Sequence, residues 1–390
     1  MLARKSIKQS YSPSPEVLEL MNEFRQMTND AIKIGIASDV SVLKRLSKLC
    51  YKELNGFRKV PTYYKLCAIS KASGIISARN KSLKRNRVTK DPYVTKPCLV
   101  SCYGFKIING KLRISLSKRM FEFIPLNKRT LKVLEDKSLS VRSFTLTQTS
   151  LSLCIVKEVP EIQAITSAIG VDRNLRNLTV GNKSKVTYYD LRKVVEIGET
   201  TRDIIASFKR NDHRIRKALA SRYGKRKKER VKNLVNKISK DVVSTRVENK
   251  EAVIFENITH IRSMYQKGNG QGNDKRRQLN NNWPFAEIKR QIEYKAVWAG
   301  IPVVHLTKSE TRGTSSNCYI CGERLQSSRE KKRQLWCKKC ERWFDRDLVA
   351  VMNISSKGWV RFAHSQGIGS EAMKGNPTTT VILRVDPMKL

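Results

Sequence analysis

The sequence predicts a mixed α/β protein with a small cysteine-rich loop inserted near its end. Short apolar strands alternate with long helical stretches in the second half of the chain, which is typical of an open α/β sheet. Four cysteines then form two Cys-x2-Cys pairs with the spacing of a zinc ribbon. With 390 residues and 39% hydrophobic content, the chain is large enough for roughly two or three domains with buried cores.

The charge limits the classes of partner. The net charge is +44, from 78 Lys+Arg against 34 Asp+Glu, and the basic residues are spread along the chain. Self-repulsion on this scale is costly unless a polyanion neutralises it. We therefore expect nucleic acid as the partner, over a long contact path, with an anionic membrane surface as the weaker alternative. The sequence has no run of about 18 apolar residues, so we expect no membrane span.

Two features argue against secretion. Residues 1–10 lack the apolar core of a secretion signal. Five of the nine cysteines are scattered outside the two pairs, which is typical of buried free thiols in a reducing compartment.

Residues 11–90 are predicted to form a small helical unit. Apolar residues recur at helical spacing in three stretches of it: Val17 to Phe24, Val40 to Cys50 and Tyr64 to Lys84. The last stretch ends in a basic run that includes Lys84 and Arg85, for which we expect contacts with nucleic acid.

Residues 95–160 are predicted to form a small antiparallel sheet or barrel. Asn109–Gly110 lies between two alternating stretches, 105–108 and 111–116. This dipeptide favours a two-residue hairpin turn, because both of its positions need a positive φ.

Three acids border buried strands: Asp172, Glu256 and Asp347. Asp172 follows Ile169–Val171, Glu256 follows Ala252–Phe255, and Asp347 lies just beyond the second cysteine pair. Strand ends bring such residues to one edge of an α/β sheet. For any single acid, a strand-end cap or a surface ion pair is the commoner explanation. The order of the three favours a metal-dependent nuclease.

Three converging carboxylates cannot all stay ionised without cations. Two Mg²⁺ ions about 3.5–4 Å apart would neutralise them and hold the attacking water and the leaving oxygen of a phosphodiester. Of the acids after the second cysteine pair, Asp345 is expected to cap the following helix, and Asp347 is expected to be the metal ligand.

A basic helical stretch lies between the first two acids. Residues 209–240 hold fourteen Lys/Arg against two acids, so i,i+4 ion pairing is scarce. A solvated helix face is the alternative, but we expect phosphate contacts from Lys209, Arg210, Arg214, Lys225, Arg226, Lys227 and Lys228. Residues 267–272 are rich in glycine and predict a flexible loop, which we expect to act as a lid.

The cysteine pairs predict a structural zinc site. Four thiolates saturate a tetrahedral ion and leave no open position for catalysis. The expected ligands are Cys318, Cys321, Cys337 and Cys340. Basic residues within the loop, Arg333 among them, are expected either to touch nucleic acid or to serve solubility.

At these residues the chain resembles the OrfB/TnpB family of transposon-encoded, RNA-guided DNA endonucleases, which are relatives of the type V CRISPR effectors and the Fanzor proteins. The matching stretches are Gly170–Asp172 with Asn177–Leu178, Ile254–Asn257, Tyr294–Ala296 with Gly300, Thr314–Ser316, and Asp345–Asp347 with Asn353–Ile354. They span residues 169–354, whereas the first 160 residues match only in architecture.

The resemblance implies a RuvC-like (RNase H fold) nuclease domain with an inserted zinc ribbon, beside an N-terminal helical recognition unit and a β-barrel wedge domain. The implied limits are a wedge domain at 1–10 and 91–165, a helical recognition domain at 11–90, a nuclease domain at 166–312 and 342–360, a ribbon that binds target nucleic acid at 313–341, and a tail, partly disordered, at 361–390.

The resemblance also implies a guide RNA and a double-stranded DNA target that is cut next to a short motif. Asp172, Glu256 and Asp347 take the places of the family's catalytic acids, with Mg²⁺ as the catalytic and Zn²⁺ as the structural metal. An intracellular site in the cytoplasm or nucleoid of a prokaryotic host follows. The alternatives are an RNA-guided DNA-binding regulator without cleavage, and a transposase that joins DNA ends. The residues predict neither a monomer nor a dimer.

Three positions depart from the family pattern. Asn174 and Glu341 stand where glycine is usual, and Val349 stands where asparagine is common. None of these changes removes a carboxylate, but the absence of an asparagine at 349 is expected to weaken the support of the metal ligands.

Overall fold

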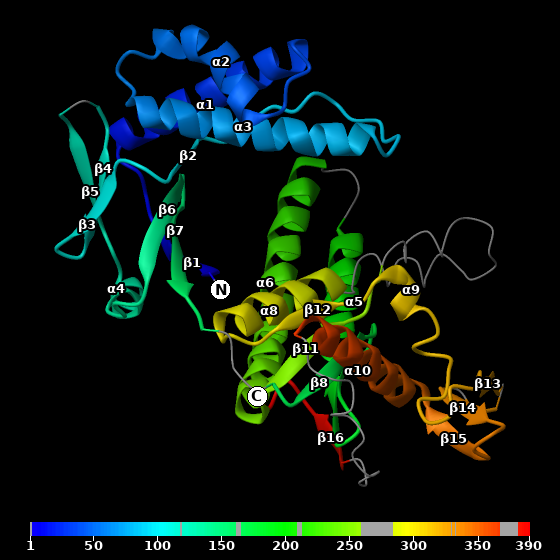
Figure 1. Cartoon of the computed structure of the whole chain (residues 1–390). Coiled ribbons are helices and arrows are strands. Elements are labelled where there is room, and N and C mark those ends of the chain that lie inside the picture. Colours follow the sequence, from blue (N-terminus) through cyan, green and yellow to red (C-terminus); the bar gives the residue numbers. More distant parts are fainter. Residues whose placement is uncertain are drawn as a thin grey trace. The chain divides into compact units, whose positions relative to one another are not determined.

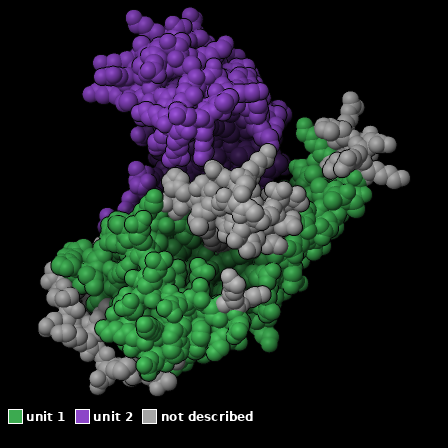
Figure 2. Space-filling view, turned by 90° about the vertical axis from the view of Figure 1, so that its right-hand side faces the viewer, with its two compact units in different colours: residues 1, 159–390 green, residues 2–158 purple. Residues whose placement is uncertain are grey.

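The computed structural model of the chain describes residues 2–117, 119–160, 165–208, 213–258, 284–328, 330–331, 333–366 and 381–390, with backbone alone at 213–216. Two compact units divide it, residues 2–158 and residues 159–390 (Figure 2). Within the described residues, every helix is too short or too polar to cross a membrane.

The first unit contains the three predicted helices, labelled in Figure 1: α1 (Pro15–Ala37), α2 (Leu43–Glu53) and α3 (Thr62–Leu83). A short 3-10 turn, η1 (Leu54–Gly56), follows α2. The Ser14 side chain accepts a hydrogen bond from the backbone N–H of Val17 and so caps α1. Phe24 and Met27 of α1 and Ile69 of α3 belong to one buried core, so the apolar stripes of these helices face each other.

Two antiparallel sheets complete this unit. The larger has the order β1 (Leu2–Ser10), β7 (Ser150–Glu158), β6 (Ser140–Thr147) and β2 (Cys98–Ser101). The smaller has the order β3 (Phe105–Ile108), β4 (Lys111–Ser115) and β5 (Phe121–Pro125), and α4 (Lys128–Leu134) follows it. Asn109 and Gly110 have φ of 48° and 71°, which confirms the predicted hairpin turn.

The strands are antiparallel, as predicted, but the described ones form two separate sheets instead of one sheet or barrel. The chain leaves β2 through Gly104, whose φ of 67° lies in the left-handed region that glycine adopts at low cost. A Cβ at this position would collide with the ring of Tyr63, so the turn also needs the missing side chain. After this turn the chain starts a new sheet with β3 instead of extending the first one.

The second unit is built on a six-stranded mixed sheet. Its order is β12 (Val303–His305), β11 (Glu251–Phe255), β8 (Ser167–Arg173), β9 (Asn177–Gly181), β10 (Lys185–Asp190) and β16 (Val381–Val385). Strands β8, β9 and β10 form an antiparallel meander. Strand β11 pairs in parallel with β8, and β12 pairs in parallel with β11.

Helices cover both faces of this sheet. The helices around one core are α5 (Arg192–Ser207), α6 (His213–Asn249) and α8 (Phe285–Trp298), whereas α10 (Arg346–Ser365) packs on the other face, across β8, β9 and β11 (Figure 1). Residues 169, 171, 253 and 255 face α6 and α8, while 168, 252 and 254 face α10. This alternation is expected of strands buried on both sides.

In the sequence, a ribbon lies between β12 and α10. It contains the short helix α9 (Lys308–Thr311) at its start and then β13 (Gln326–Ser327), β14 (Gln334–Cys337) and β15 (Arg342–Asp345). Strand β15 runs directly into α10, so the position of the ribbon fixes where that helix begins.

Close packing of α10 depends on glycine. A Cβ at Gly170 of β8 would collide with the backbone carbonyl of Val351, and a Cβ at Gly358 of α10 would collide with the side chain of Ile254. The missing side chains let helix and sheet approach each other more closely than ordinary residues allow.

The C-terminal segment differs from the predicted tail in its described parts. Helix α10 continues to Ser365, and β16 pairs in parallel with β10. Val381, Ile382 and Leu383 alternate too little to indicate a half-buried strand, so the sequence pattern did not reveal this edge strand. The predicted loop at 267–272 lies outside the described residues.

Candidate active site and cysteine group

Strand register brings Asp172 and Glu256 side by side. Val171 of β8 pairs with Phe255 of β11 in parallel, so the residues that follow each of them are neighbours. Side chains alternate along a strand. Asp172 therefore shares a face with Gly170, and Glu256 continues the face of Ile254, which is the face that α10 covers.

The start of α10 carries Asp347 to the same place. Asp345 caps the helix, since its Oδ1 accepts hydrogen bonds from the backbone N–H groups of Asp347 (2.9 Å) and Leu348 (3.0 Å). The predicted division of roles between the two acids is thus confirmed for the cap. Asp347 lies in the first turn and is buried.

Two asparagines connect these segments. The Asn174 Nδ2 donates to Asp172 Oδ2 at 2.7 Å and to Asp347 Oδ1 at 3.2 Å. The Asn177 Nδ2 donates to Asp347 Oδ2 at 2.8 Å. The loop between β8 and β9 therefore holds the carboxylate of α10 against that of β8. Asn174, which departs from the family pattern, is the residue that contacts both acids.

Burial and neighbouring charge act on the carboxyl groups. Burial raises the pKa of Asp172 well above its ordinary value, and the nearby carboxylates of Glu256 and Asp347 raise it further. Burial also raises the pKa of Glu256, although the Arg173 guanidinium opposes this shift. Such a cluster favours a bound cation, because a cation restores the ionised form of each acid.

Two arginines lie within the cluster. The Arg173 Nε is 3.0 Å from Glu256 Oε1, and its two terminal nitrogens donate to the backbone carbonyls of Phe285 (3.1 Å) and Glu256 (3.1 Å). Arg333, at the base of β14, forms an ion pair with Asp347. Both the Arg173 and Glu256 side chains are buried, so this pair is rigidly held.

Sequence reasoning missed the roles of these arginines. Arg173 directly follows Asp172. Its contact with Glu256 joins the end of β8 to the end of β11, and a contact between two distant segments leaves no local sequence pattern. Arg333 was grouped with the basic residues of the ribbon. Its φ of 76° is uncommon for a residue with a side chain, and it places the guanidinium toward Asp347.

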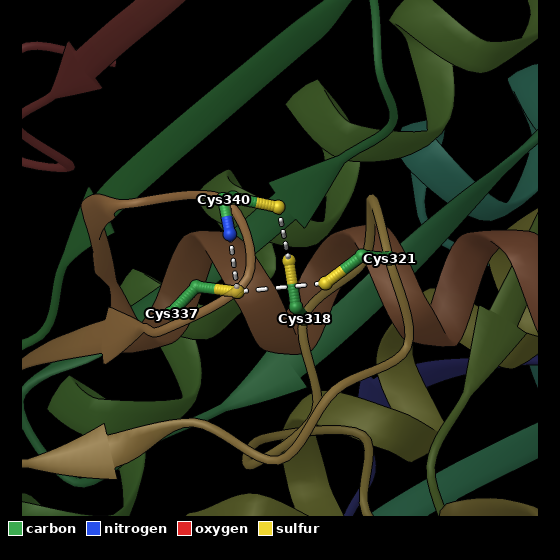
Figure 3. A group of neighbouring side chains, drawn as sticks. All are labelled: Cys318, Cys321, Cys337 and Cys340. Carbon is green, nitrogen blue, oxygen red and sulfur yellow. Dashed lines mark hydrogen bonds between the residues drawn. The ribbon is translucent and has the colours of Figure 1, made fainter.

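The four paired cysteines form one group (Figure 3). Their sulfur atoms all lie within 4.8 Å of one another, with 3.8 Å between Cys318 and Cys340 and 3.5 Å between Cys321 and Cys337. A tetrahedral ion with Zn–S bonds of about 2.3 Å requires sulfurs about 3.8 Å apart. The group can therefore hold a metal ion such as zinc.

The carboxylates are arranged more loosely than the thiols. Among the described residues, the cysteine group is the one set of potential ligands that gathers within this distance, and the three acids do not form such a set. Asn174 instead links Asp172 to Asp347, while Arg173 binds Glu256 and Arg333 binds Asp347. Wider spacing suits a site in which different acids bind different ions.

The basic residues singled out in the sequence lie on several elements. Lys225, Arg226 and Lys228 are exposed on α6, and Lys227 beside them is half-buried. Burial lowers the pKa of Lys227. In the first unit, Lys84 and Arg85 are exposed at the end of α3.

The side chains of three further basic residues lie outside the described part of the structure. Lys209 and Arg210 lie outside the described residues. Arg214 belongs to α6, but its side chain lies outside the described part.

Comparison with known proteins identifies similar sequences. A family model for the Cas12f1-like TNB domain matches residues 285–354, which include the four cysteines and Asp347. A TnpB-like protein of Methanocaldococcus jannaschii is 29% identical over 280 residues, covering 68% of this chain and 95% of the relative. The matched domain, the relative and the motifs around Asp172, Glu256 and Asp347 agree, and all of them make the chain similar to TnpB-like proteins.

Proposed function

We propose that this chain is a transposon-associated, RNA-guided and Mg²⁺-dependent endonuclease that cuts double-stranded DNA next to a short motif. Similarity to the Cas12f1-like TNB domain and to a TnpB-like protein supports a nuclease with guide RNA and DNA as partners. The observation that carries the proposal is the meeting of Asp172, Glu256 and Asp347 at one buried position, from three segments far apart in the sequence.

The sheet supports a RuvC-like, RNase H-type nuclease domain. An antiparallel meander, β8–β9–β10, is extended by the parallel strands β11 and β12. Asp172 and Glu256 lie where the two adjacent parallel strands, β8 and β11, end, which is where open α/β sheets place their sites.

The donor set fits Mg²⁺. Carboxylate oxygens are its preferred protein ligands. Asp172, Glu256 and Asp347 would hold the ions, and the chemistry supplied by bound Mg²⁺ is activation of a water and stabilisation of the leaving oxygen.

The surrounding side chains orient these ligands. Asn174 fixes the carboxylates of Asp172 and Asp347 relative to each other, and Asn177 holds the second oxygen of Asp347. Arg173 holds one oxygen of Glu256 through its Nε. Arg333 lies beside Asp347 with its side chain half exposed, where a guanidinium can contact a phosphate.

The polynucleotide is held by charge. RNA–DNA pairing would read the target sequence, while the protein contacts the backbone of the heteroduplex without reading it. The exposed cations of α6 and of the end of α3 supply such contacts. The four-cysteine group, with structural zinc, would hold β14 and β15 in register at the start of α10.

The test begins with the RNA that the chain carries. The RNA that co-purifies with the full chain is sequenced, and a plasmid library is built in which the matching sequence is preceded by a randomised motif. We expect Mg²⁺-dependent double-strand breaks next to one motif. Asp172→Ala should reduce cutting by several orders of magnitude and retain RNA, because its loss removes a metal ligand and leaves the basic surfaces intact.

A matched control variant tests whether the loss of any single acidic charge reduces cutting. Glu248 is an exposed acid near the end of α6. Glu248→Ala should cut like the wild type. Equal cutting by wild type and Asp172→Ala would refute the assignment of the acids. Bound RNA and target DNA with no cutting by the wild type would instead favour the regulator without cleavage.

A further inference from the structure

The outer face of the sheet β3–β4–β5 combines aromatic rings with cations. Side chains alternate along each strand, so the strand registers sort them onto two faces. One face carries the buried Leu112, Ile114 and Ile124. The other face, called the outer face below, carries Lys106, Ile108, Lys111, Arg113, Ser115, Phe121, Phe123 and Pro125.

The two rings of the outer face are unusually accessible. Phe121 is 42% exposed and Phe123 is 48% exposed, whereas phenylalanine is mostly buried in folded proteins. The rings are two residues apart on one strand, so they are about 7 Å apart and offer two separate flat surfaces. A sheet face that contacts only water would not need two exposed aromatic rings.

Cations surround both rings. The Arg113 guanidinium lies 4.6 Å from the centre of the Phe121 ring. The same arginine pairs across the strands with Phe123 on one side and Lys106 on the other. None of the cations on the outer face has an ion pair among the described residues. The single acid of the three strands, Glu122, belongs to the opposite face.

This combination has one well-matched ligand chemistry. Bases stack on aromatic rings whatever their sequence, and neighbouring cations hold the phosphates. The bases of a duplex are already stacked on one another, so exposed rings favour unpaired nucleotides. A protein partner of this positive face would need acids to match the cations as well as apolar groups to cover the rings.

We propose that the outer face is a stacking platform for unpaired nucleotides of the RNA that the chain carries. The choice of RNA rests on the proposed function. RNA is there the nucleic acid bound before any target is met, so its unpaired nucleotides are continuously present. Phe121 and Phe123 each stack a base, while Lys106, Lys111 and Arg113 contact its phosphates.

The experiment measures RNA binding without cleavage. The full chain carrying Asp172→Ala is titrated with a labelled single-stranded RNA of about 20 nucleotides, a length that exceeds the site size of a typical single-strand-binding fold. Phe121→Leu with Phe123→Leu keeps apolar bulk but removes both rings. Loss of stacking weakens binding by about 5- to 150-fold per base, and this variant removes two rings, so we expect a loss of at least about 30-fold.

Two controls separate stacking from folding. Phe121→Tyr with Phe123→Tyr keeps the rings and should bind nearly as tightly as the wild type. Glu122→Gln alters the same strand on the other face and should leave binding unchanged. A further variant, Lys106→Gln with Arg113→Gln, should flatten the salt dependence of binding, and it tests the platform even if the leucine variant folds poorly.

Three results would overturn the platform. They are unchanged RNA affinity in a folded leucine variant, an equal loss of affinity for duplex RNA, and a loss confined to single-stranded DNA of the same sequence. Failure here leaves the nuclease assignment untouched, because that rests on plasmid cutting and on Asp172→Ala. Conversely, a wild type that cuts nothing would leave the stacking result standing.

Discussion

At the residue scale, Asn174 contacts two of the three acids of the site. Its single Nδ2 donates to both Asp172 and Asp347, which come from β8 and α10. Glycine, usual here in the family, can make no such side-chain contact. This chain therefore ties its sheet to its helix through a side chain at the position of an expected turn residue.

Removal of Asn174 should weaken metal binding. In Asn174→Ala the two carboxylates lose their shared donor, so we expect the Mg²⁺ concentration for half-maximal cutting to rise about 10- to 100-fold. Asn127 caps α4 in the other unit, and Asn127→Ala is the matched control. An unchanged Mg²⁺ requirement in Asn174→Ala would show that its hydrogen bonds do not orient the ligands.

Lys295 of α8 makes stability depend on pH. Burial lowers its pKa to about 8, and its Nζ donates to the Asn236 carbonyl and the Ser239 hydroxyl of α6 at 2.7 Å each. Its ordinary value is 10.5. Below pH 8 the group is charged in both states and the folded state bears the full desolvation cost. That cost disappears as the pH rises from about 8 toward 10.5, because the unfolded chain then binds more protons.

The stability of wild type relative to Lys295→Gln should therefore rise across this pH window. Urea unfolding of both proteins at pH 7.5, 8.5 and 9.5 checks it, with other titrating groups cancelling in the difference. A difference that stays flat with pH would mean that Lys295 keeps an ordinary pKa in the folded protein.

At the element scale, the ribbon determines where α10 begins. Gln334 of β14 pairs with Asp345 of β15, and the backbone N–H of Arg346 donates to the Arg333 carbonyl at 2.9 Å. Tyr188 of β10 adds a hydrogen bond from its hydroxyl to Asp345 at 3.2 Å. The first turn of the helix, with its carboxylate, is thus held by contacts from two other elements.

Loss of the zinc from the four-cysteine group should reduce cutting at the carboxylate site, although none of these cysteines is one of its acids. Cys337→Ser removes one of four thiols, so we expect loss of bound zinc, a disordered start of α10 and cutting reduced at least about 100-fold. Binding of RNA should be largely retained. Metal analysis and plasmid cutting on the same preparation check this. Cys154→Ser, on β7 in the other unit, is the control. Full activity after removal of zinc would refute the coupling.

Sequence patterns were most informative where structure is local. The helix around Val17 to Phe24, the Asn109–Gly110 turn and the capping role of Asp345 follow from short-range periodicity and turn chemistry, and all are confirmed. The departure at Glu341 has a physical reason too. Its φ of 50° is a left-handed conformation, which explains why glycine is usual there.

Patterns were least informative where a contact joins distant segments. Arg173 and Arg333 reach their carboxylates across strand ends, and β16 joins the sheet from the end of the chain. None of these contacts produces a periodic pattern of residue types in the sequence. The strand ends did predict which acids would meet, because parallel register alone puts Glu256 beside Asp172.

At the scale of the whole molecule, charge should dominate affinity. Replacement of Lys225, Arg226, Lys227 and Lys228 of α6 by glutamine removes up to four cations that can neutralise phosphates. The slope of log affinity for duplex DNA against log salt should become less steep by about 0.9 for each phosphate that is no longer neutralised. Glu229→Gln, in the same run, should tighten binding slightly. An unchanged slope in the fourfold variant would show that this part of α6 faces solvent.

The pairing of β1 with β7 has a consequence for synthesis. The partners are residues 2–10 and 150–158, so β1 has no mate until about 140 further residues have been made. Until then an unpaired strand edge is exposed, and closing such a long loop slows folding. Arg4, Lys5 and Lys8 place positive charge along this unpaired strand, a feature that protects strand edges from pairing with one another.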